Sequence, residues 1–293
     1  MGNSNQSKLS DGINISGSIG INVLIKDDRK IILFSDDHAN IQYCKDNKSI
    51  NIADLLYNKI NDSNIIIEEV PRKLGVKLFG LWESKHVEEL KNLYLNNNNK
   101  ITGIDIRPYL IDFSIDLISN NKEYCLVTLY FYLNKINNFF NRKNIYVDSD
   151  SIKEKINECI NNINEKNTGI CNHFKRLRTE FYNFYKELNE KNLLNKNLYF
   201  ILSNYKYVLD KIEYFLDSII EWYTILKIFS LKGTSFVHTG LYHSKNIYYQ
   251  LKNFYNFTSL YNDGYVNEFP KYPISSCVFI PKKINEYIGN TIF

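Results

Sequence analysis

Two carboxylates and an imidazole stand together in the segment Ser35-Asp36-Asp37-His38, directly after the apolar run Ile31 to Phe34. An imidazole beside carboxylates suits general-base catalysis or the binding of a divalent metal. In the structural alternative, Asp36 or Asp37 caps a helix that continues through Ile41, and His38 donates to a backbone carbonyl. We favour the functional role, because similar polar clusters follow other apolar runs of the chain.

Two adjacent glutamates, Glu68 and Glu69, follow a second apolar run, Ile65 to Ile67. Successive side chains of a strand point to opposite faces, so the two carboxylates do not easily enter one site. The interpretation narrowly favours Glu68 as the site residue, with Glu69 paired to Arg72.

Asp105 and Arg107 belong to a third cluster, at the end of the run Ile101 to Ile106. Two residues apart on a strand, they share one face. This spacing permits a charge pair or a shared anion-binding role in a site, and equally a purely structural ion pair.

Two histidines flank a glycine in the late segment Val237 to Ser244. His238 has the position of a core strand residue, and the core and site interpretations weigh equally for it. His243 is the stronger candidate, because Ser244 is a typical N-cap residue and would place this imidazole at a helix N-terminus. The remaining histidines, His86 and His173, lie on helix-like stretches with charged neighbours and are expected to serve no site.

Apolar runs alternate with amphipathic stretches along much of the chain, which is the rhythm of βαβ units. We therefore expect an α/β fold with a mostly parallel β-sheet flanked by helices, and a ligand at the carboxyl ends of its strands. The expected strands are 31–34, 65–67, 101–106, 235–238 and 277–280, and the expected helices between them include 52–60 and 87–94.

The organisation expected from these patterns is one α/β domain over residues 19–293 with a large helical insertion at about 123–232. Within the insertion, apolar residues of 205–229 step by four and three in alternation, which predicts one continuous buried helix face. Residues 1–18 are rich in Ser, Asn and Gly, and are expected to form a flexible tail.

Composition excludes several classes of protein. The 36 basic and 32 acidic residues leave a net charge of only +4, so a nucleic-acid partner is not expected. The chain has no apolar run of about 18 to 20 residues and no secretory signal, which predicts no transmembrane segment. The opening Met1 to Ser7 matches an acylation signal only in part.

The five cysteines are odd in number, widely spaced and free of CxxC pairs. This spacing favours neither a disulfide framework nor a zinc finger, and it predicts an intracellular, cytoplasmic protein. No GxSxG, Walker or GxGxxG motif occurs, which disfavours serine hydrolases of the usual kind, P-loop enzymes and dinucleotide enzymes.

The order of the polar clusters resembles the superfamily that joins erythromycin esterases, ChaN-like haem-binding proteins and the TraB/Tiki group. Ser35 to His38 stands where that superfamily shows G-E/T-x-H, with Ser35 and Asp36 departing from the pattern. Ile67-Glu68-Glu69 corresponds to its strand-end glutamate, and Gly240-Leu241-Tyr242-His243 matches its G-x-x-H. The resemblance implies a hydrolase, with His38, Glu68 and His243 in one pocket that acts on a small-molecule or peptide substrate.

One divalent metal would fit that pocket on Asp36, His38, Glu68 and His243. A second resemblance is to calcineurin-like metallophosphoesterases, because Ser35 to Asn40 is similar to their S-D-x-H-G-N motif. Their later G-D-x-x-D and G-N-H-E motifs are absent here. A third interpretation is a non-catalytic α/β binding protein whose 41 Tyr and Phe residues supply contact surface.

Overall fold

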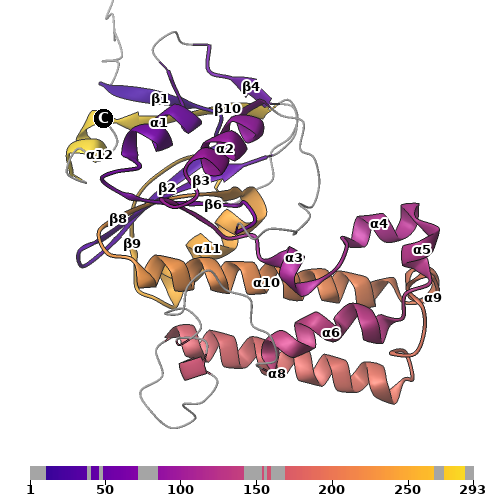
Figure 1. The fold of residues 1–293 in the computed structure, drawn as a ribbon. Coiled ribbons are helices and arrows are strands. Elements are labelled where there is room, and N and C mark those ends of the chain that lie inside the picture. The colour runs from indigo at the N-terminus through magenta and orange to yellow at the C-terminus, as the bar shows by residue number, and fades with distance from the viewer. Residues whose placement is uncertain are drawn as a thin grey trace, which may run out of the picture. The chain divides into compact units, whose positions relative to one another are not determined.

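The computed structural model describes residues 11–37, 41–45, 49–71, 85–141, 154, 157–159, 169–266 and 274–287. The chain divides into two compact units. We call Met1–Ile67, Trp82–Thr102 and Lys232–Phe293 the sheet unit, and Glu68–Leu81 and Gly103–Leu231 the helical unit. Each is described by itself (Figure 1).

A six-stranded sheet organises the sheet unit, and at its centre β6, β8 and β3 run parallel. β2 pairs antiparallel with both β3 and β9 at one side. The α/β class with a mostly parallel sheet flanked by helices is thus confirmed. In spatial order the strands are β7 (Ile101–Gly103), β6 (Asn64–Ile67), β8 (Thr234–Gly240), β3 (Arg29–Asp36), β2 (Gly20–Lys26) and β9 (Thr258–Gly264).

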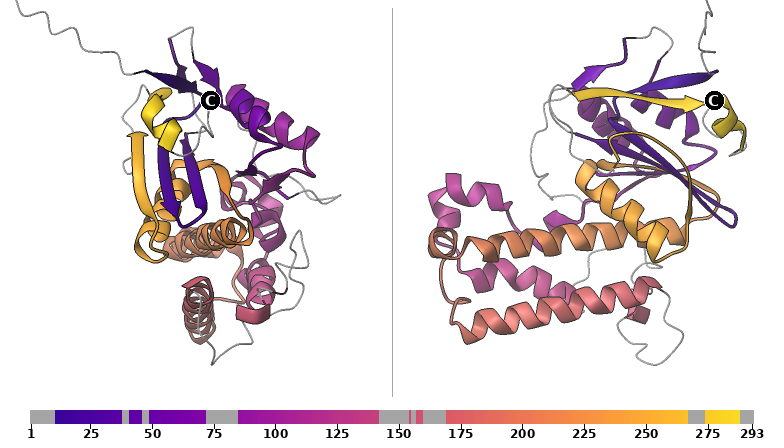
Figure 2. Two further views of the ribbon diagram at one scale, coloured as in Figure 1. Left: turned by 90° about the vertical axis from the view of Figure 1, so that its left-hand side faces the viewer. Right: turned by 180° about the vertical axis from the view of Figure 1, so that it is seen from behind.

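Helices cover both faces of this sheet (Figure 2). Alternation along β3 points Ile32 and Phe34 to one face, where they share a core with Leu55 of α1 (Ile52–Lys59) and Leu90 of α2 (Lys85–Asn96). The opposite face is covered by α11 (Leu241–Asn253), which contacts β3 and β8. Because both faces are buried, the central strands are almost entirely apolar.

A second, four-stranded sheet contributes Ile15, Val278 and Ile280 to the same core. Its order is β4 (Ile41–Tyr43), β10 (Ile274–Pro281), β1 (Gly12–Ser16) and β5 (Ile50–Asn51), and α12 (Lys282–Tyr287) follows β10. β1 runs antiparallel to β10, whereas β4 runs parallel to it.

This second sheet corrects two predictions. Residues 12–16, expected in a flexible tail, form β1, because Ile13 and Ile15 alternate with small or polar residues and find a partner strand far along the chain. Ile41, expected in a helix, instead starts β4 (Ile41–Tyr43) for the same non-local reason.

The helical unit packs around aromatic side chains. Phe174 lies 4.7 Å from Trp222 and 5.7 Å from Phe140 between ring centroids, and the Trp222 indole donates to the carbonyl of Ile170. The unit starts before the expected position 123 and comprises α3 (Arg107–Leu110), α4 (Ile115–Asn120), α5 (Lys122–Cys125), α6 (Leu129–Phe140), α8 (Gly169–Glu190), α9 (Leu198–Asn204) and α10 (Lys206–Ser230).

α10 confirms the long helix predicted from the alternating apolar steps, and Gly233, at φ +76°, follows its end. The strand expected at 101–106 is shorter, because β7 ends at Gly103 and α3 starts at Arg107-Pro108. Part of the expected insertion, including residues 142–153 and 160–168, lies outside the described residues.

The cysteine prediction was wrong. Cys44 is bonded to Cys277 and Cys159 to Cys171, and Cys125 is a free thiol. The first bridge spans 233 residues and depends on the pairing of β4 with β10, which spacing in the sequence does not reveal. The cysteines therefore no longer argue for a reducing compartment.

Over the described residues, no helix is long and apolar enough to span a bilayer.

We expect Phe236→Ala to lower the free energy of unfolding by about 3 to 5 kcal/mol, because it leaves a cavity in the centre of the sheet unit. Phe236 is fully buried and stacks on Phe34. Urea unfolding monitored by circular dichroism measures the loss. Phe254→Ala, at a side chain that is 53% exposed, is the matched control and should change stability little.

Candidate functional site

Asp36 and His86 form a buried pair in the sheet unit. Asp36 is the last residue of β3, and His86 lies in the first turn of α2. The His86 Nε2 atom is 2.7 Å from Asp36 Oδ1, and both side chains are fully buried. An ionised carboxylate only accepts hydrogen bonds, so Nε2 is the donor of this bond, and in the neutral tautomer that fits it Nδ1 carries the free electron pair.

The His86 Nδ1 atom is buried and has no hydrogen-bond partner among the described residues. Tyr43 closes one side of the ring: its phenol oxygen accepts from the His86 backbone N–H at 3.2 Å, and the two rings meet edge to face. A Cβ at Gly17 would lie 3.3 Å from the His86 Cβ. A buried nitrogen without a partner costs free energy, which calls for a functional explanation.

A second imidazole lies on the same face of the sheet. In the parallel pairing of β3 with β8, Phe34 is the partner of His238 and Asp36 is the partner of Gly240. Side chains of paired residues share a face, so His238 lies on the face of Phe34 and Asp36. His238 is only 4% exposed. The carboxyl ends of β3 and β8 thus carry the Asp36 carboxylate and the His238 imidazole on one face of the sheet, and α2 brings the His86 imidazole to Asp36.

His86 was not predicted as a site residue from the sequence, although its position on an apolar helix face indicates a buried imidazole. Leu90, Leu93 and Tyr94 are buried on α2 at helical spacing from His86. An imidazole at the head of an apolar helix face has to meet a polar partner in the core. The charged neighbours of His86 in sequence concealed this, because they occupy other faces of the helix.

His243 lies in the first turn of α11 and is 5% exposed. The N-cap residue of this helix is Gly240, so the expected N-cap role of Ser244 was wrong. The Ser244 hydroxyl instead contacts the Thr239 hydroxyl at 2.7 Å and the Phe34 carbonyl at 3.1 Å. These contacts tie the start of α11 to the ends of β3 and β8.

A different cluster surrounds Arg107 in the helical unit. Asp105 binds the guanidinium through two oxygens, at 2.8 Å to Nε and 3.1 Å to Nη2. Glu68 lies 3.1 Å from Nη2, and Asp217 lies 3.9 Å from Nη1. All three guanidinium nitrogens therefore face carboxylates of the protein, which favours the structural ion pair over an anion-binding role.

Electrostatics keep Arg107 charged. Burial lowers the pKa of its guanidinium, but Asp105, Glu68 and Asp217 together raise this pKa above its ordinary value. Glu69 contributes through its backbone, whose carbonyl accepts from the Asp105 N–H at 3.1 Å. Arg72, the expected partner of Glu69, lies outside the described residues.

α10 carries an acidic stripe at helical spacing, which predicts a solvated face, and the structure departs from this prediction; the stripe consists of Asp210, Glu213, Asp217 and Glu221. Asp210 and Glu213 are exposed, as such a face requires. Asp217 has a side chain only 16% exposed and faces Arg107, and Glu221 is 4% exposed. Opposite charge on α3 explains the burial of Asp217, which periodicity alone does not show.

The predicted site residues are distributed between the two units. Asp36 and His243 belong to the sheet unit, whereas Glu68, Glu69, Asp105 and Arg107 belong to the helical unit. His38 lies outside the described residues. Their convergence in one cleft stays a prediction.

Metal binding also stays a prediction. Within the described part of the chain, no group of three or more His, Cys, Asp or Glu side chains could hold a metal ion. Asp36 and His86 offer one oxygen and one nitrogen, fewer than the three protein ligands typical of a catalytic zinc site.

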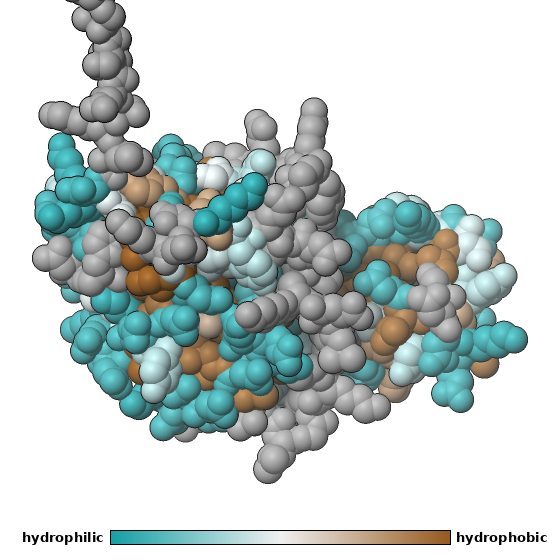
Figure 3. All heavy atoms as spheres, turned by 90° about the horizontal axis from the view of Figure 1, so that it is seen from above, coloured by the Kyte–Doolittle hydropathy of each residue, from teal (hydrophilic) through white to brown (hydrophobic). Residues whose placement is uncertain are grey.

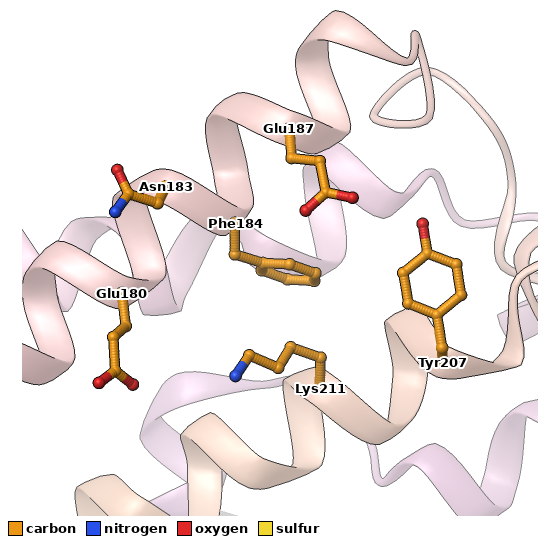
Figure 4. A pocket seen from close by; sticks show the side chains of 6 residues that line it. All are labelled: Glu180, Asn183, Phe184, Glu187, Tyr207 and Lys211. Carbon is orange, nitrogen blue, oxygen red and sulfur yellow. The ribbon is translucent and has the colours of Figure 1, made fainter.

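A hollow in the helical unit lies between α8 and α10 (Figure 4). Lys191 binds Glu187 at its rim, and the Lys211 ammonium lies 4.2 Å from the centre of the Tyr214 ring. The lining contains no imidazole, the side chain whose ordinary pKa lies nearest to neutral pH. It is lined by Glu180, Asn183, Phe184, Glu187, Tyr207 and Lys211.

Aromatic side chains serve both the core and the surface. Phe34, Phe174 and Trp222 are fully buried, whereas Phe131 and Tyr199 are more than half exposed. Apolar patches lie scattered among polar residues on the face drawn in Figure 3. Aromatic enrichment therefore does not discriminate a binding protein from an enzyme.

Comparison with protein-family models, curated proteins and solved structures gives no match.

We expect Arg107→Ala to lower the free energy of unfolding by about 1 to 3 kcal/mol, because three carboxylates lose their cation. This is less than for a fully buried pair, since the Arg107 side chain is 28% exposed. Urea unfolding at about pH 7 and pH 4 measures the loss, which should shrink in acid as the carboxylates take up protons. Arg178→Ala, at a residue that faces the Tyr182 ring, is the control.

Glu213→Gln should raise the unfolding midpoint at neutral pH. Burial raises the pKa of Glu213, as do the charges of Asp116 and Asp210, while Arg107 opposes them. The folded state then holds this proton more tightly than the unfolded state, so stability falls as pH rises through the raised pKa. The variant lacks this fall and should match the wild type in acid. Equal midpoints at all pH values, as expected for Glu190→Gln, would contradict the shift.

Proposed function

We propose that the sheet unit is a hydrolase domain in which His86 is the general base that activates water and Asp36 orients it. The observation that carries this proposal is the 2.7 Å bond between Asp36 Oδ1 and His86 Nε2, with a buried Nδ1 that has no partner among the described residues. A base held in one tautomer by a carboxylate recurs in hydrolytic enzymes.

Position in the fold supports the same assignment. Asp36 ends a central strand of the sheet, and in α/β proteins ligands bind beyond the carboxyl ends of the strands. His238 and His243 lie at the adjacent end of β8 and the start of α11. Either imidazole can serve as a proton donor to a leaving group, which hydrolysis requires in addition to a base.

Ester substrates fit this equipment best. Water activated by an imidazole attacks the carbonyl of a carboxylic ester without any covalent enzyme intermediate. The resemblance to the erythromycin esterase superfamily favours the same reaction, although His38 and Glu68 would carry it there. The Asp36–His86 pair supplies a base that is independent of both residues.

The activity test compares the wild type with His86→Gln and Asp36→Asn on panels of carboxylic and phosphoric esters. His86→Gln should lower kcat by about 10² to 10⁴-fold with little change in KM, because the base acts in the transition state. Asp36 acts through His86, so Asp36→Asn should lower kcat similarly, and the double variant should be hardly worse than either single one.

His173→Gln is the matched control, because this imidazole lies in the helical unit, outside the proposed dyad. Circular dichroism confirms that each variant is folded. If the wild type hydrolyses an ester and His86→Gln hydrolyses it at the same rate, the assignment of His86 as the base is wrong. The absence of hydrolysis on every ester by a folded wild type, both with and without dithiothreitol, would favour the binding-protein interpretation.

A further inference from the structure

The Cys44–Cys277 disulfide lies beside the proposed dyad. Cys44 directly follows β4, and Cys277 lies in β10. Both of these cysteines are partly exposed, whereas Cys159 and Cys171 of the other bridge are 0% and 5% exposed. A dissolved thiol therefore reaches the Cys44–Cys277 bridge more easily, and exposed disulfides are the labile ones.

β4 is a strand of three residues. All three pair with β10, with Tyr43 opposite Ser276. The backbone N–H of Cys44 donates to the Ser16 hydroxyl at 3.2 Å. The disulfide adds a covalent bond at the end of this short ladder, next to Tyr43.

Tyr43 connects β4 to the dyad. Its phenol oxygen accepts from the His86 backbone N–H, and its ring lies 6.3 Å from the imidazole between centroids. The His86 side chain is fully buried in this arrangement. A substrate therefore reaches Nδ1 only after a neighbouring segment moves, and β4 is the neighbour whose position depends on a reducible bond.

We propose that the Cys44–Cys277 disulfide is a redox-controlled latch: reduction releases β4, withdraws Tyr43 from His86 and opens the dyad. A dithiol supplies two electrons and two protons, the bond between the two cysteine sulfurs breaks, two thiols form, and the dithiol becomes a disulfide. The effect on hydrolysis rests on the proposed function, whereas the exposure of His86 does not.

The test measures the exposure of His86 in the full-length protein. Cys125 is first blocked with N-ethylmaleimide, and the protein is then treated with diethylpyrocarbonate before and after reduction by dithiothreitol. Peptide mass spectrometry follows each histidine. We expect the modification rate of His86 to rise about tenfold or more on reduction through local opening. The rate of His173 is followed in Cys159→Ala with Cys171→Ala, where the bridge next to this histidine is absent, and should stay constant there.

Variants separate the latch from a general loosening. Cys44→Ser with Cys277→Ser should expose His86 without reductant, and Tyr43→Ala should expose it in both redox states. Cys159→Ala with Cys171→Ala, the matched control, should still respond to dithiothreitol. Ester hydrolysis, where it is found, should rise in parallel with the exposure of His86.

Three results would overturn the latch. His86 could stay unreactive in the reduced protein and in Cys44→Ser with Cys277→Ser. Both cysteines could react with N-ethylmaleimide before any reductant is added. His86 and His173 could become reactive together on reduction of Cys159→Ala with Cys171→Ala, which would indicate general unfolding. If His86 opens on reduction but no ester is hydrolysed, the latch stands and the proposed hydrolase function fails.

Discussion

The Asp36 carboxylate is buried at the end of β3, and its hydrogen bond to His86 constrains the elements around it. A buried carboxylate without a partner is costly, so the first turn of α2 has to place its imidazole within 2.7 Å of the end of β3. Leu90 and Tyr94 pack α2 onto the core in the orientation that achieves this. Tyr43 of the second sheet then packs against the imidazole, and Gly17, which follows β1, leaves room for the His86 Cβ.

The two units solve their charge problems differently. In the helical unit, Asp105, Glu68 and Asp217 surround Arg107. Each of the three guanidinium nitrogens lies near a carboxylate. In the sheet unit, Asp36 binds one nitrogen of His86 and leaves the other without a partner in the described chain. The first arrangement is suited to stability, and the second retains an atom that can take up a proton.

Local patterns in the sequence predicted the parts of the fold that local patterns determine. Apolar runs located β3, β6 and β8, and the alternating steps of α10 located that helix. The second sheet and both disulfides depend on pairing between segments far apart in the chain, and a single sequence carries no local sign of such pairing. The same limit explains Glu221, whose burial comes from tertiary packing.

Of the two residues of the candidate site, one was predictable from the sequence. Asp36 was singled out by its place after an apolar run, and the end of β3 holds it as expected. His86, the partner of Asp36, was not predicted as a site residue. Its charged neighbours in the sequence indicate a solvent-exposed position, whereas the helix face that it shares with Leu90 and Leu93 is buried. The buried helix face of His86 is therefore the signal in the sequence that indicates a site residue.

The protonation pattern of the His86 ring tests the account most directly. Two-bond nitrogen–proton correlation NMR of protein labelled with nitrogen-15 distinguishes the two neutral tautomers, and His86→Gln assigns the signals. The account predicts a neutral ring with its proton on Nε2, where Asp36 accepts it, and a bare Nδ1. A proton on Nδ1 of the neutral ring would contradict it, because the atom proposed to activate water would then have no free electron pair.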